Sequence, residues 1–405
     1  MTVGVGGKTP EQALAGLAQM TEGMKPVGLD EYQSRIAKAQ GLMREQGIAA
    51  LYLNAGSNLY YFTGVKWSPS ERMVGAVLPA NGALAYIAPA FEEGTIRDFR
   101  EVDGFIHGWQ EHESPYRLLL DMLAAMGVAA DAVVGLCPSL AFFMFDGIRR
   151  LGSDLKFVDA SCVTNLCRYH KSATELALMQ RAKDMTLEVQ KAAASILRAG
   201  ISTTEVAEFI REAHRKVGAP GSTFCTVLFG EASAFPHGVK HAQVLKDGDM
   251  VLIDTGCLLH GYQSDITRSY VFGTPSDRQR ALWNLEKTAQ LAAFDAARLG
   301  EPCQVVDAAA RLALEAAGLG PDYQLPGLPH RTGHGIGLDI HEGPYLVRGD
   351  LTPLAEGMCF SNEPMICIPG EFGIRLEDHF YMTATGPRWF TRPSHSVDDP
   401  FGLQA

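Results

Sequence analysis

Hydrophobic and polar positions along the first part of the chain predict alternating helices and strands. An amphipathic run over residues 31–47 predicts a helix that Gly47 ends, and the apolar run 48–53 predicts a buried strand directly after it. Further strands are expected at residues 73–78, 83–88, 132–135 and 156–158, and further helices at 92–100, 116–125 and 140–151. This alternation is typical of a layered α/β domain.

The expected end of this region lies near residues 161–171, of which residues 168–171 form a polar stretch. Ser172 and Glu175 then have the spacing of a capping box, which predicts a long helix reaching about residue 197. Two helices followed by strands occur twice from here on. The expected helices cover 173–197, 203–217, 277–299 and 304–317, and the expected strands cover 223–229, 250–257, 266–272, 358–363 and 375–383. The repetition indicates a diverged internal duplication.

These patterns predict three parts. Residues 1–30 are expected to be a loose N-terminal tail, residues 31–165 a first α/β domain, and residues 166–405 a second domain that carries the chemistry. A chain of 405 residues is long enough for two domains.

Composition narrows the class of protein. With 46% apolar and 20% charged residues, the chain has the composition of a soluble globular protein. A net charge of -11 argues against nucleic acid or an anionic membrane as a partner. No apolar run reaches the roughly 18 residues of a membrane helix, and the N-terminus lacks a hydrophobic signal core. None of the eight cysteines forms a Cys-x-x-Cys pair, so we expect reduced, buried thiols in a cytoplasmic protein.

Ligand-type side chains stand in or beside apolar runs of the second domain. They are Asp254, Asp265, His334, Glu363 and Glu377. The two Asp are 11 residues apart (265 − 254), and glycines between them suggest a hairpin that turns both toward one interior. An isolated Asp more often caps a turn or is solvated, so the argument rests on the whole set.

Buried carboxylates are costly unless they are paired or hold a metal. Four carboxylates supply -4, and two divalent cations would balance them. An oxygen-rich set with one imidazole suits two such ions, with Mn²⁺ the first expectation and Co²⁺, Zn²⁺ or Fe²⁺ also possible. Divalent ions acidify water and polarise a peptide carbonyl, so the set predicts metal-assisted hydrolysis.

The motifs around these residues resemble one metallopeptidase family. They read Val251-Leu-Ile-Asp254, His330-Arg-Thr-Gly-His334-Gly-Ile-Gly, His341-Glu-Gly-Pro344, Ser361-Asn-Glu363-Pro and Gly373-Ile-Arg375-Leu-Glu377-Asp378. In this order they resemble prolidase, aminopeptidase P, methionine aminopeptidase and creatinase, which share the pita-bread fold. The resemblance spans residues 32–391. The first domain, with Tyr60-Tyr-Phe-Thr-Gly64, favours the prolidase and aminopeptidase P branch.

The resemblance also implies roles. Asp265 and Glu377 would bridge two metals, Asp254 would complete one, and His334 and Glu363 the other. Glu363 would act as base. His237 and His341 would contact substrate and assist proton transfer or stabilise the intermediate, and His330 would bind substrate. Arg375 would pair with a ligand carboxylate or bind substrate, while Glu342 and Asp378 would orient ligands.

The implied activity is hydrolysis of the bond before proline, most of all in Xaa-Pro dipeptides, by a homodimer or larger homo-oligomer. Aminopeptidase P activity on longer peptides, a small-molecule hydrolase or lyase, and an inactive binding module stay open. Met365 stands where the family often has glycine, which changes the pocket wall. Glu363 and Glu377 are 14 residues apart (377 − 363), which leaves no room for the arginine-bearing insertion of some prolidases.

Overall fold

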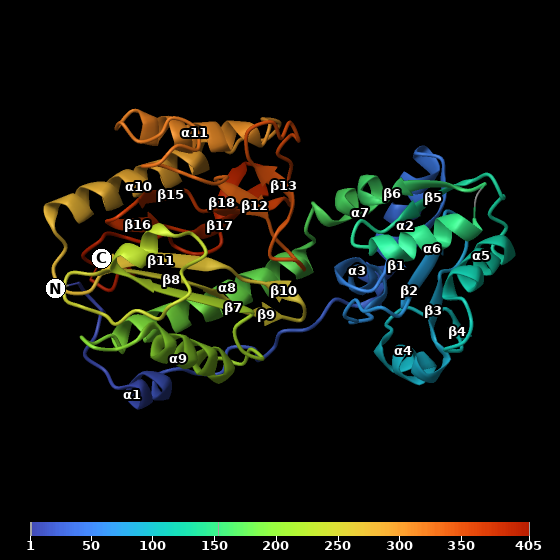
Figure 1. The fold of residues 1–405 in the computed structure, drawn as a ribbon, viewed down its shortest axis with the longest axis horizontal. Helices are drawn as coiled ribbons and strands as arrows, with labels where there is room; N and C mark the ends of the chain where they lie inside the picture. The colour runs from blue at the N-terminus through green and yellow to red at the C-terminus, as the bar shows by residue number, and fades with distance from the viewer. Residues whose placement is uncertain (1, 153, 405) are drawn as a thin grey trace. The chain divides into compact units, whose positions relative to one another are not determined.

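The computed structural model describes residues 2–152 and 154–404 and divides the chain into two compact units (Figure 1). One unit is Val27–Arg168, and the other joins Met1–Pro26 to Tyr169–Ala405. No helix among the described residues is long and apolar enough to cross a membrane.

The unit Val27–Arg168 is a mixed sheet flanked by helices. Its strands lie in the order β4-β3-β2-β1-β5-β6. They are β1 (Ile48–Asn54), β2 (Gly75–Pro79), β3 (Ala85–Pro89), β4 (Phe105–Trp109), β5 (Val133–Leu136) and β6 (Lys156–Asp159). The helices are α2 (Leu29–Glu45), α3 (Ser57–Thr63), α4 (Glu93–Phe99), α5 (Pro115–Ala125), α6 (Phe142–Leu151) and α7 (Ser161–Arg168). The apolar run of β1 lies at the centre of the sheet, which explains why it is buried.

Three of these elements were not predicted: β4, α3 and α7, the last of which covers most of the stretch where the end of the region was expected. Strand β4 is a short edge strand, and only Ile106 and Trp109 of its residues are buried, so its apolar signal is weak. Helix α3 has 7 residues and follows Asn54 and Gly56. Asn and Gly are typical of turns, so the sequence indicated a turn here and no helix.

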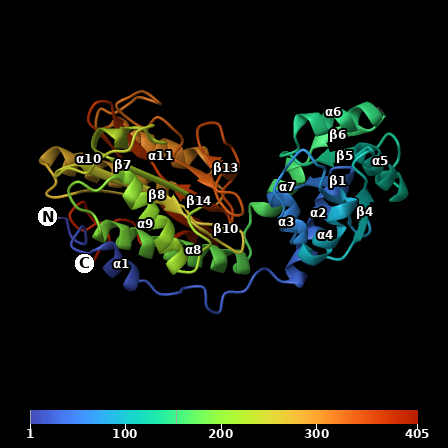
Figure 2. The ribbon, with the colours of Figure 1, turned by 60° about the horizontal axis from the view of Figure 1, so that its bottom comes forward.

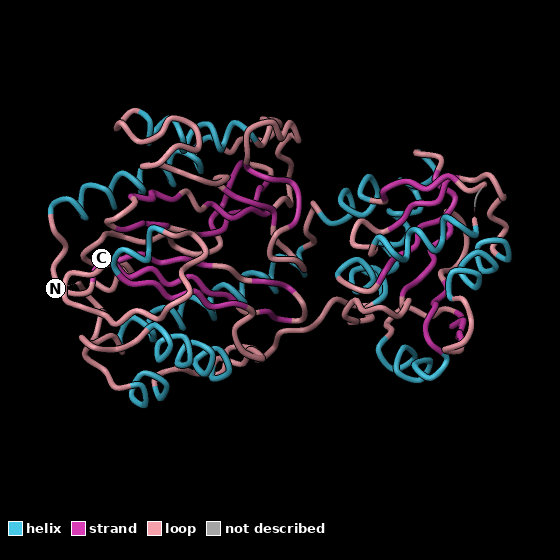
Figure 3. The backbone as a smooth tube through the Cα atoms, in the orientation of Figure 1, coloured by secondary structure: helices cyan, strands magenta, loops and turns pink. Residues whose placement is uncertain are grey.

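In the second unit, strands lie between two pairs of helices, as Figures 1 and 2 both show. The helices are α8 (Ala173–Ser195) with α9 (Thr203–Lys216), and α10 (Asp277–Ala296) with α11 (Gln304–Glu315). The predicted capping box of Ser172 and Glu175 is present, and Ser202 and Ser276 form two more. The mixed α/β fold with a duplicated helix-helix-strand order is confirmed (Figure 3).

Two main sheets fill the space between the helix pairs. The first has the order β11-β8-β7, and the second β13-β12-β14-β17-β18. Their strands are β7 (Phe224–Phe229), β8 (Met250–Gly256), β11 (Ile266–Val271), β12 (Gly333–Gly335), β13 (Glu342–Leu346), β14 (Cys359–Asn362), β17 (Asp378–Thr383) and β18 (Gly386–Trp389). Two hairpins complete the unit: β9 (Leu258–Leu259) with β10 (Tyr262–Gln263), and β15 (Met365–Ile368) with β16 (Phe372–Arg375).

The single strand expected over residues 375–383 was wrong, because the chain changes sheets within it. Strand β16 ends at Arg375, and β17 begins at Asp378 in another sheet. Between them the backbone N–H of Glu377 donates to the carbonyl of Thr267 at 3.2 Å. The break therefore places Glu377 against the end of β11.

The expectation of a loose N-terminal tail was also wrong for the described residues 2–26. Thr2 is buried and donates its hydroxyl to the carbonyl of Val271 at 2.7 Å, and the N–H of Val3 donates to Asp398 at 2.7 Å. A capping box of Thr9 and Gln12 starts helix α1 (Pro10–Ala15). The glycine-rich composition suggested a flexible segment. The hydrogen bonds that order it join it to residues far along the chain, which local composition cannot indicate.

Candidate metal centre

The hairpin predicted between Asp254 and Asp265 brings both side chains to one face. Strand β11 pairs antiparallel with β8, and Thr267 lies opposite Asp254. Side chains two residues apart share a face of a strand, so Asp265 and Thr267 point the same way. Asp265 is 5% exposed, which places one carboxylate in the protein interior.

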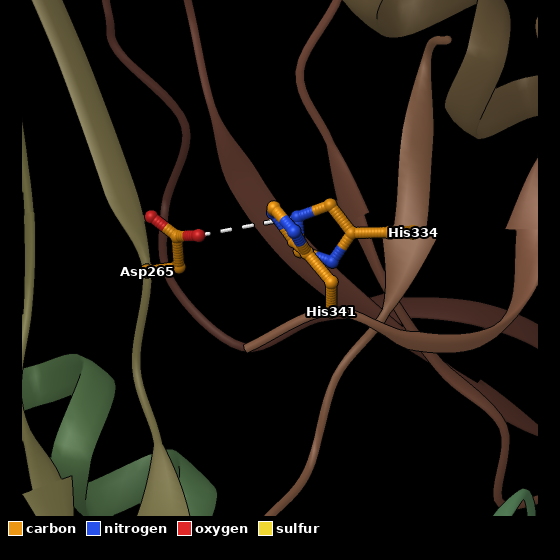
Figure 4. Close-up of side chains that lie close together, drawn as sticks. All are labelled: Asp265, His334 and His341. Carbon is orange, nitrogen blue, oxygen red and sulfur yellow. Dashed lines mark ion pairs between the residues drawn. The ribbon is translucent and has the colours of Figure 1, made fainter. Parts of the chain in front are cut away.

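His334 faces these acids from β12. Its Nε2 lies 3.0 Å from Glu363 Oε1. The same atom lies 3.9 Å from Asp265 Oδ2, the pair that the dashed line in Figure 4 marks. Its Nδ1 donates to the carbonyl of Gly335 at 2.9 Å, which leaves Nε2 unprotonated in the neutral ring. Ser361 donates to Glu363 Oε1 at 3.0 Å and accepts from the His334 backbone N–H at 2.9 Å. The serine thus orients both groups.

Glu377 is held from the opposite side by a chain of polar contacts. Thr267 Oγ1 donates to Glu377 Oε2 at 2.7 Å and accepts from Arg375 Nε at 3.0 Å. Arg375 Nη2 in turn donates to Asp254 Oδ2 at 2.5 Å. Two candidate ligands, Glu377 and Asp254, are therefore linked to each other through Thr267 and Arg375.

Unpartnered buried atoms converge at this point. Asp254 Oδ1, Asp265 Oδ1, Glu377 Oε1 and His334 Nε2 are buried and have no hydrogen-bond partner. Burial, followed by the charges of neighbouring carboxylates, raises the pKa of Asp265 and of Glu377 well above the ordinary range. Buried acceptors that repel one another are destabilising unless a cation lies among them, so this donor set fits a divalent metal.

Three overlapping groups have ligand atoms within 4.8 Å of one another. They are Asp265–His334–His341, Asp265–Glu377–His379 and His334–Glu363–Glu377. Asp254 belongs to none of these groups and is linked to the cluster through Arg375. The structure therefore brings the five predicted ligands to one region, although the metal-binding roles stay predictions.

The three predicted histidines outside this set lie around the same cluster. The ring of His341 is 4.2 Å from that of His334, and burial together with charge on His334 lowers the pKa of His341 to about 4. His330 Nδ1 donates to the Arg331 carbonyl at 2.7 Å, while its Nε2 is buried and unpartnered. Burial is the main cause that lowers the pKa of His330, and a charge on His237 adds a smaller lowering to the pKa of His330 and of His341, so His237 lies near both rings.

Arg375 is engaged by the protein. Besides Asp254 and Thr267, it contacts the Pro236 carbonyl at 3.2 Å and the Met365 sulfur at 3.7 Å through Nη1. Its side chain is 5% exposed. These contacts favour the predicted ion pair with a ligand carboxylate. A substrate-binding role stays a prediction and would have to compete with them.

Glu342 and Asp378 have buried cationic partners. Lys171 Nζ donates to Glu342 Oε1 at 2.6 Å. Arg268 makes a two-point contact with Asp378, through Nη2 to Oδ1 at 2.7 Å and Nη1 to Oδ2 at 3.2 Å, and also donates to the Glu377 carbonyl at 2.8 Å. Asp378 therefore supports the candidate ligand Glu377 through Arg268.

Sequence reasoning missed several residues of the site. Thr267 and Arg268 lie two and three residues after the candidate ligand Asp265, and the two-residue period of a strand could have placed Thr267 beside Asp265. Lys183 is fully buried on α8, donates to the Gln263 carbonyl at 3.2 Å, and has its pKa lowered to about 8 by burial. His379 lies in an apolar run, where it had the pattern of a core residue. No local signal marks Lys183.

The second unit has two halves, each of strands covered by a helix pair, and a cluster of carboxylates and imidazoles lies between them. This fold and this site define the protein as a pita-bread metallopeptidase. Residues 177–384 match the model of metallopeptidase family M24, and residues 35–170 match that of the creatinase/prolidase N-terminal domain. The chain belongs to metallopeptidase family M24. Membership in this family implies bound divalent metal.

Known proteins similar to the chain are dipeptidases and prolidases by name. The putative dipeptidase YkvY of Bacillus subtilis is 33% identical over 360 residues, which cover 87% of this chain and 96% of that protein. The crystal structure of dipeptidase PepE from Mycobacterium ulcerans superposes with a TM-score of 0.85 at 32% identity, covering 92% of this chain and 99% of that one. The crystal structure of the prolidase from Thermococcus sibiricus superposes with a TM-score of 0.81 at 29% identity, covering 89% of this chain and 97% of that one.

His341→Ala is expected to lower kcat by roughly 10²-fold, the scale of a lost proton transfer or oxyanion contact. The residue is exposed and packs edge-to-face against the ring of His334, so a substrate can reach it. Metal content, measured by elemental analysis, should match that of the wild type.

His241→Ala is the control for this variant, because His241 is an exposed histidine of the second unit with no proposed role. Near wild-type turnover in His341→Ala would remove the residue from the mechanism. Loss of metal in that variant would instead make it a ligand.

Proposed function

We propose that this metallopeptidase hydrolyses the peptide bond before proline in Xaa-Pro dipeptides. The observation that carries the proposal is the convergence of unpartnered buried atoms from Asp254, Asp265, His334 and Glu377. The names of the similar proteins, dipeptidase and prolidase, support the substrate class. The name dipeptidase does not specify proline, so the preference for proline is tested separately below.

The proposed centre holds two divalent ions, Mn²⁺ in the first place, through Asp254, Asp265, His334, Glu363 and Glu377. Bound there, the ions supply polarisation of the scissile carbonyl and acidification of water. The four carboxylates can balance two divalent charges. We further propose a cytoplasmic homodimer or larger homo-oligomer. The eight thiols are free, which supports a reducing compartment.

In this proposal, side chains of the protein accept and donate the protons that hydrolysis requires. In the metal-free site, burial raises the pKa of Glu363, but contact with the His334 ring when that ring is protonated, together with the charges of His330 and Arg375, outweighs burial and holds that pKa below the ordinary range. Glu363 therefore stays ionised and can accept a proton from water. Its Oε1 is fixed by Ser361 at 3.0 Å, so the carboxylate is oriented before substrate arrives.

The leaving group is a tertiary amide nitrogen, because proline has no backbone N–H. It must receive a proton as the bond breaks, and His341 and His237 are the proposed donors. Both are exposed, so substrate can reach them. Neutral His341 can donate a hydrogen bond through one ring nitrogen, which suits an oxyanion or the departing nitrogen.

Selectivity for a dipeptide requires a group that binds the free carboxylate after proline. Arg375 is occupied by Asp254 and Thr267, so it is poorly placed for this role without rearrangement. His330, with its unpartnered Nε2, and the exposed His237 are better placed. A charge-assisted hydrogen bond to such a carboxylate contributes about 1.5–3 kcal/mol.

We expect Leu-Pro to be cleaved roughly 10²-fold more efficiently than Leu-Pro-Gly or Leu-Pro amide, because both of the latter lack that carboxylate at the required place. The measurement is kcat/KM for the three substrates with metal-loaded enzyme. Leu-Ala is the matched dipeptide that tests for the proline ring.

Equal efficiency on all three proline substrates would contradict the carboxylate site and favour aminopeptidase P activity. Faster cleavage of Leu-Ala than of Leu-Pro would leave a dipeptidase without proline preference. Failure to cleave any of these peptides with bound metal would overturn the proposed activity.

A further inference from the structure

His379 is a buried histidine of the metal centre that the five predicted ligands do not include. It lies on β17, which begins at Asp378, and follows Glu377 by two residues. Its exposed fraction is 0%, and its Nε2 lies 3.4 Å from Glu377 Oε1. The ring centroids of His334 and His379 are 6.4 Å apart.

Neither ring nitrogen of His379 has a hydrogen-bond partner. Each buried polar atom without a partner costs about 1–3 kcal/mol. The atoms opposite it, Asp265 Oδ1 and Glu377 Oε1, also lack partners. The ligand atoms of Asp265, Glu377 and His379 lie within 4.8 Å of one another, a spacing that one cation could satisfy.

The geometry argues against a simple hydrogen-bonded pair of His379 and Glu377. Neither ring nitrogen of His379 nor Glu377 Oε1 has a hydrogen-bond partner, although His379 Nε2 lies 3.4 Å from that oxygen. A neutral imidazole is the form that coordinates metal. Contact with a cation would provide a partner for Nε2 and for both facing carboxylate oxygens at once.

We propose that His379 is a second imidazole ligand of the metal centre, on the side formed by Asp265 and Glu377. The inference rests on the proposed metal centre and adds a nitrogen donor to it. Imidazole ligands suit Zn²⁺ and Fe²⁺, whereas carboxylate and water ligands suit Mn²⁺. A second imidazole therefore shifts the preference of the proposed site away from Mn²⁺, the first expectation above, and toward Zn²⁺ or Fe²⁺.

The test is to count imidazole ligands in the Co²⁺-loaded protein by X-ray absorption, where imidazole rings give a distinct outer-shell scattering. The wild type is expected to show imidazoles from both His334 and His379, and His379→Gln to lose one of them. Its dissociation constant for Co²⁺, from chelator competition, should rise by at least about 10- to 100-fold, the range seen when even supporting groups of a metal site are removed.

His214→Gln is the matched control. His214 is also 0% exposed, but its ring nitrogens contact Thr186 at 3.2 Å and Ser222 at 2.8 Å. Its imidazole count and Co²⁺ affinity should equal those of the wild type. His341→Ala, whose ring also lies near the cluster, should keep both imidazoles.

A wild-type count of one imidazole per protein molecule, rather than two, overturns the proposal without any variant. The proposal can therefore be tested even if His379→Gln does not fold. An unchanged count in folded, metal-bound His379→Gln overturns it as well and leaves His379 as a hydrogen-bond donor to Glu377. Wild-type protein that cleaves Leu-Pro with a single imidazole would refute this inference alone. Protein that binds no Co²⁺ would refute it together with the proposed metal centre.

Discussion

Asp265→Asn is expected to lower kcat/KM for a cleaved dipeptide by roughly 10³-fold or more, because several kcal/mol of metal-derived stabilisation is lost with the ligand. Asp265 is 5% exposed and stands in two of the three groups able to hold an ion. Glu377→Gln should behave alike. Metal content by elemental analysis should fall with activity in both variants.

The same variant should have the opposite effect on the metal-free protein. Burial and the charge of Glu377 raise the pKa of Asp265, so its ionisation destabilises the metal-free fold. A group whose pKa is raised on folding contributes stability that is lost as pH rises through the folded pKa. Asparagine removes this loss, so metal-free Asp265→Asn should be more stable than metal-free wild type at pH 7, and the difference should shrink on acidification.

Thermal unfolding with and without metal measures this crossover. Each kcal/mol of relieved repulsion should raise the Tm of metal-free Asp265→Asn by about 2–4 °C, whereas added metal should raise the Tm of the wild type far more than that of the variant. Full activity and two tightly bound metals in Asp265→Asn would contradict its place in the centre. A Tm of metal-free Asp265→Asn below that of metal-free wild type would contradict the argument that the ionised carboxylates repel one another.

Asp378→Ala is expected to destabilise the protein by about 3–5 kcal/mol, because it leaves Arg268 buried and unpaired. The two side chains are 0% and 1% exposed, and the shortest contact between them is 2.7 Å. Arg268 also donates to the carbonyls of Thr267 and Glu377 at 3.1 and 2.8 Å, so its displacement would move a proposed ligand. Metal affinity should fall by about 10- to 100-fold as well.

Glu371→Ala is the control for this prediction. It removes one partner of the Arg278–Glu371 pair, whose shortest contact is 2.6 Å but whose side chains are 58% and 39% exposed. Exposed pairs contribute about 0–1 kcal/mol, so denaturant unfolding should place this variant close to the wild type. Equal losses in the two variants would show that burial does not set the strength of the Arg268–Asp378 pair.

Local sequence signals were sufficient for most of the fold. A capping box acts through neighbouring residues, so Ser172 and Glu175 correctly place the start of α8. Apolar runs identify β8 and β11, and the glycines between them predict the hairpin that turns Asp254 and Asp265 to one face. The order of the motifs, which resembles the metallopeptidases, then indicated the family.

Only the tertiary structure decided which partners those side chains find. Arg375 was predicted to meet either substrate or a ligand, and the approach of β16 to β8 gives it Asp254. The N-terminal residues were expected to be loose, yet Thr2 pairs with Val271. His379 has the pattern of a core residue, and it enters the site because the chain changes sheets at Glu377. Each of these contacts joins residues distant in sequence or depends on a change of sheet, and sequence periodicity carries no information about either.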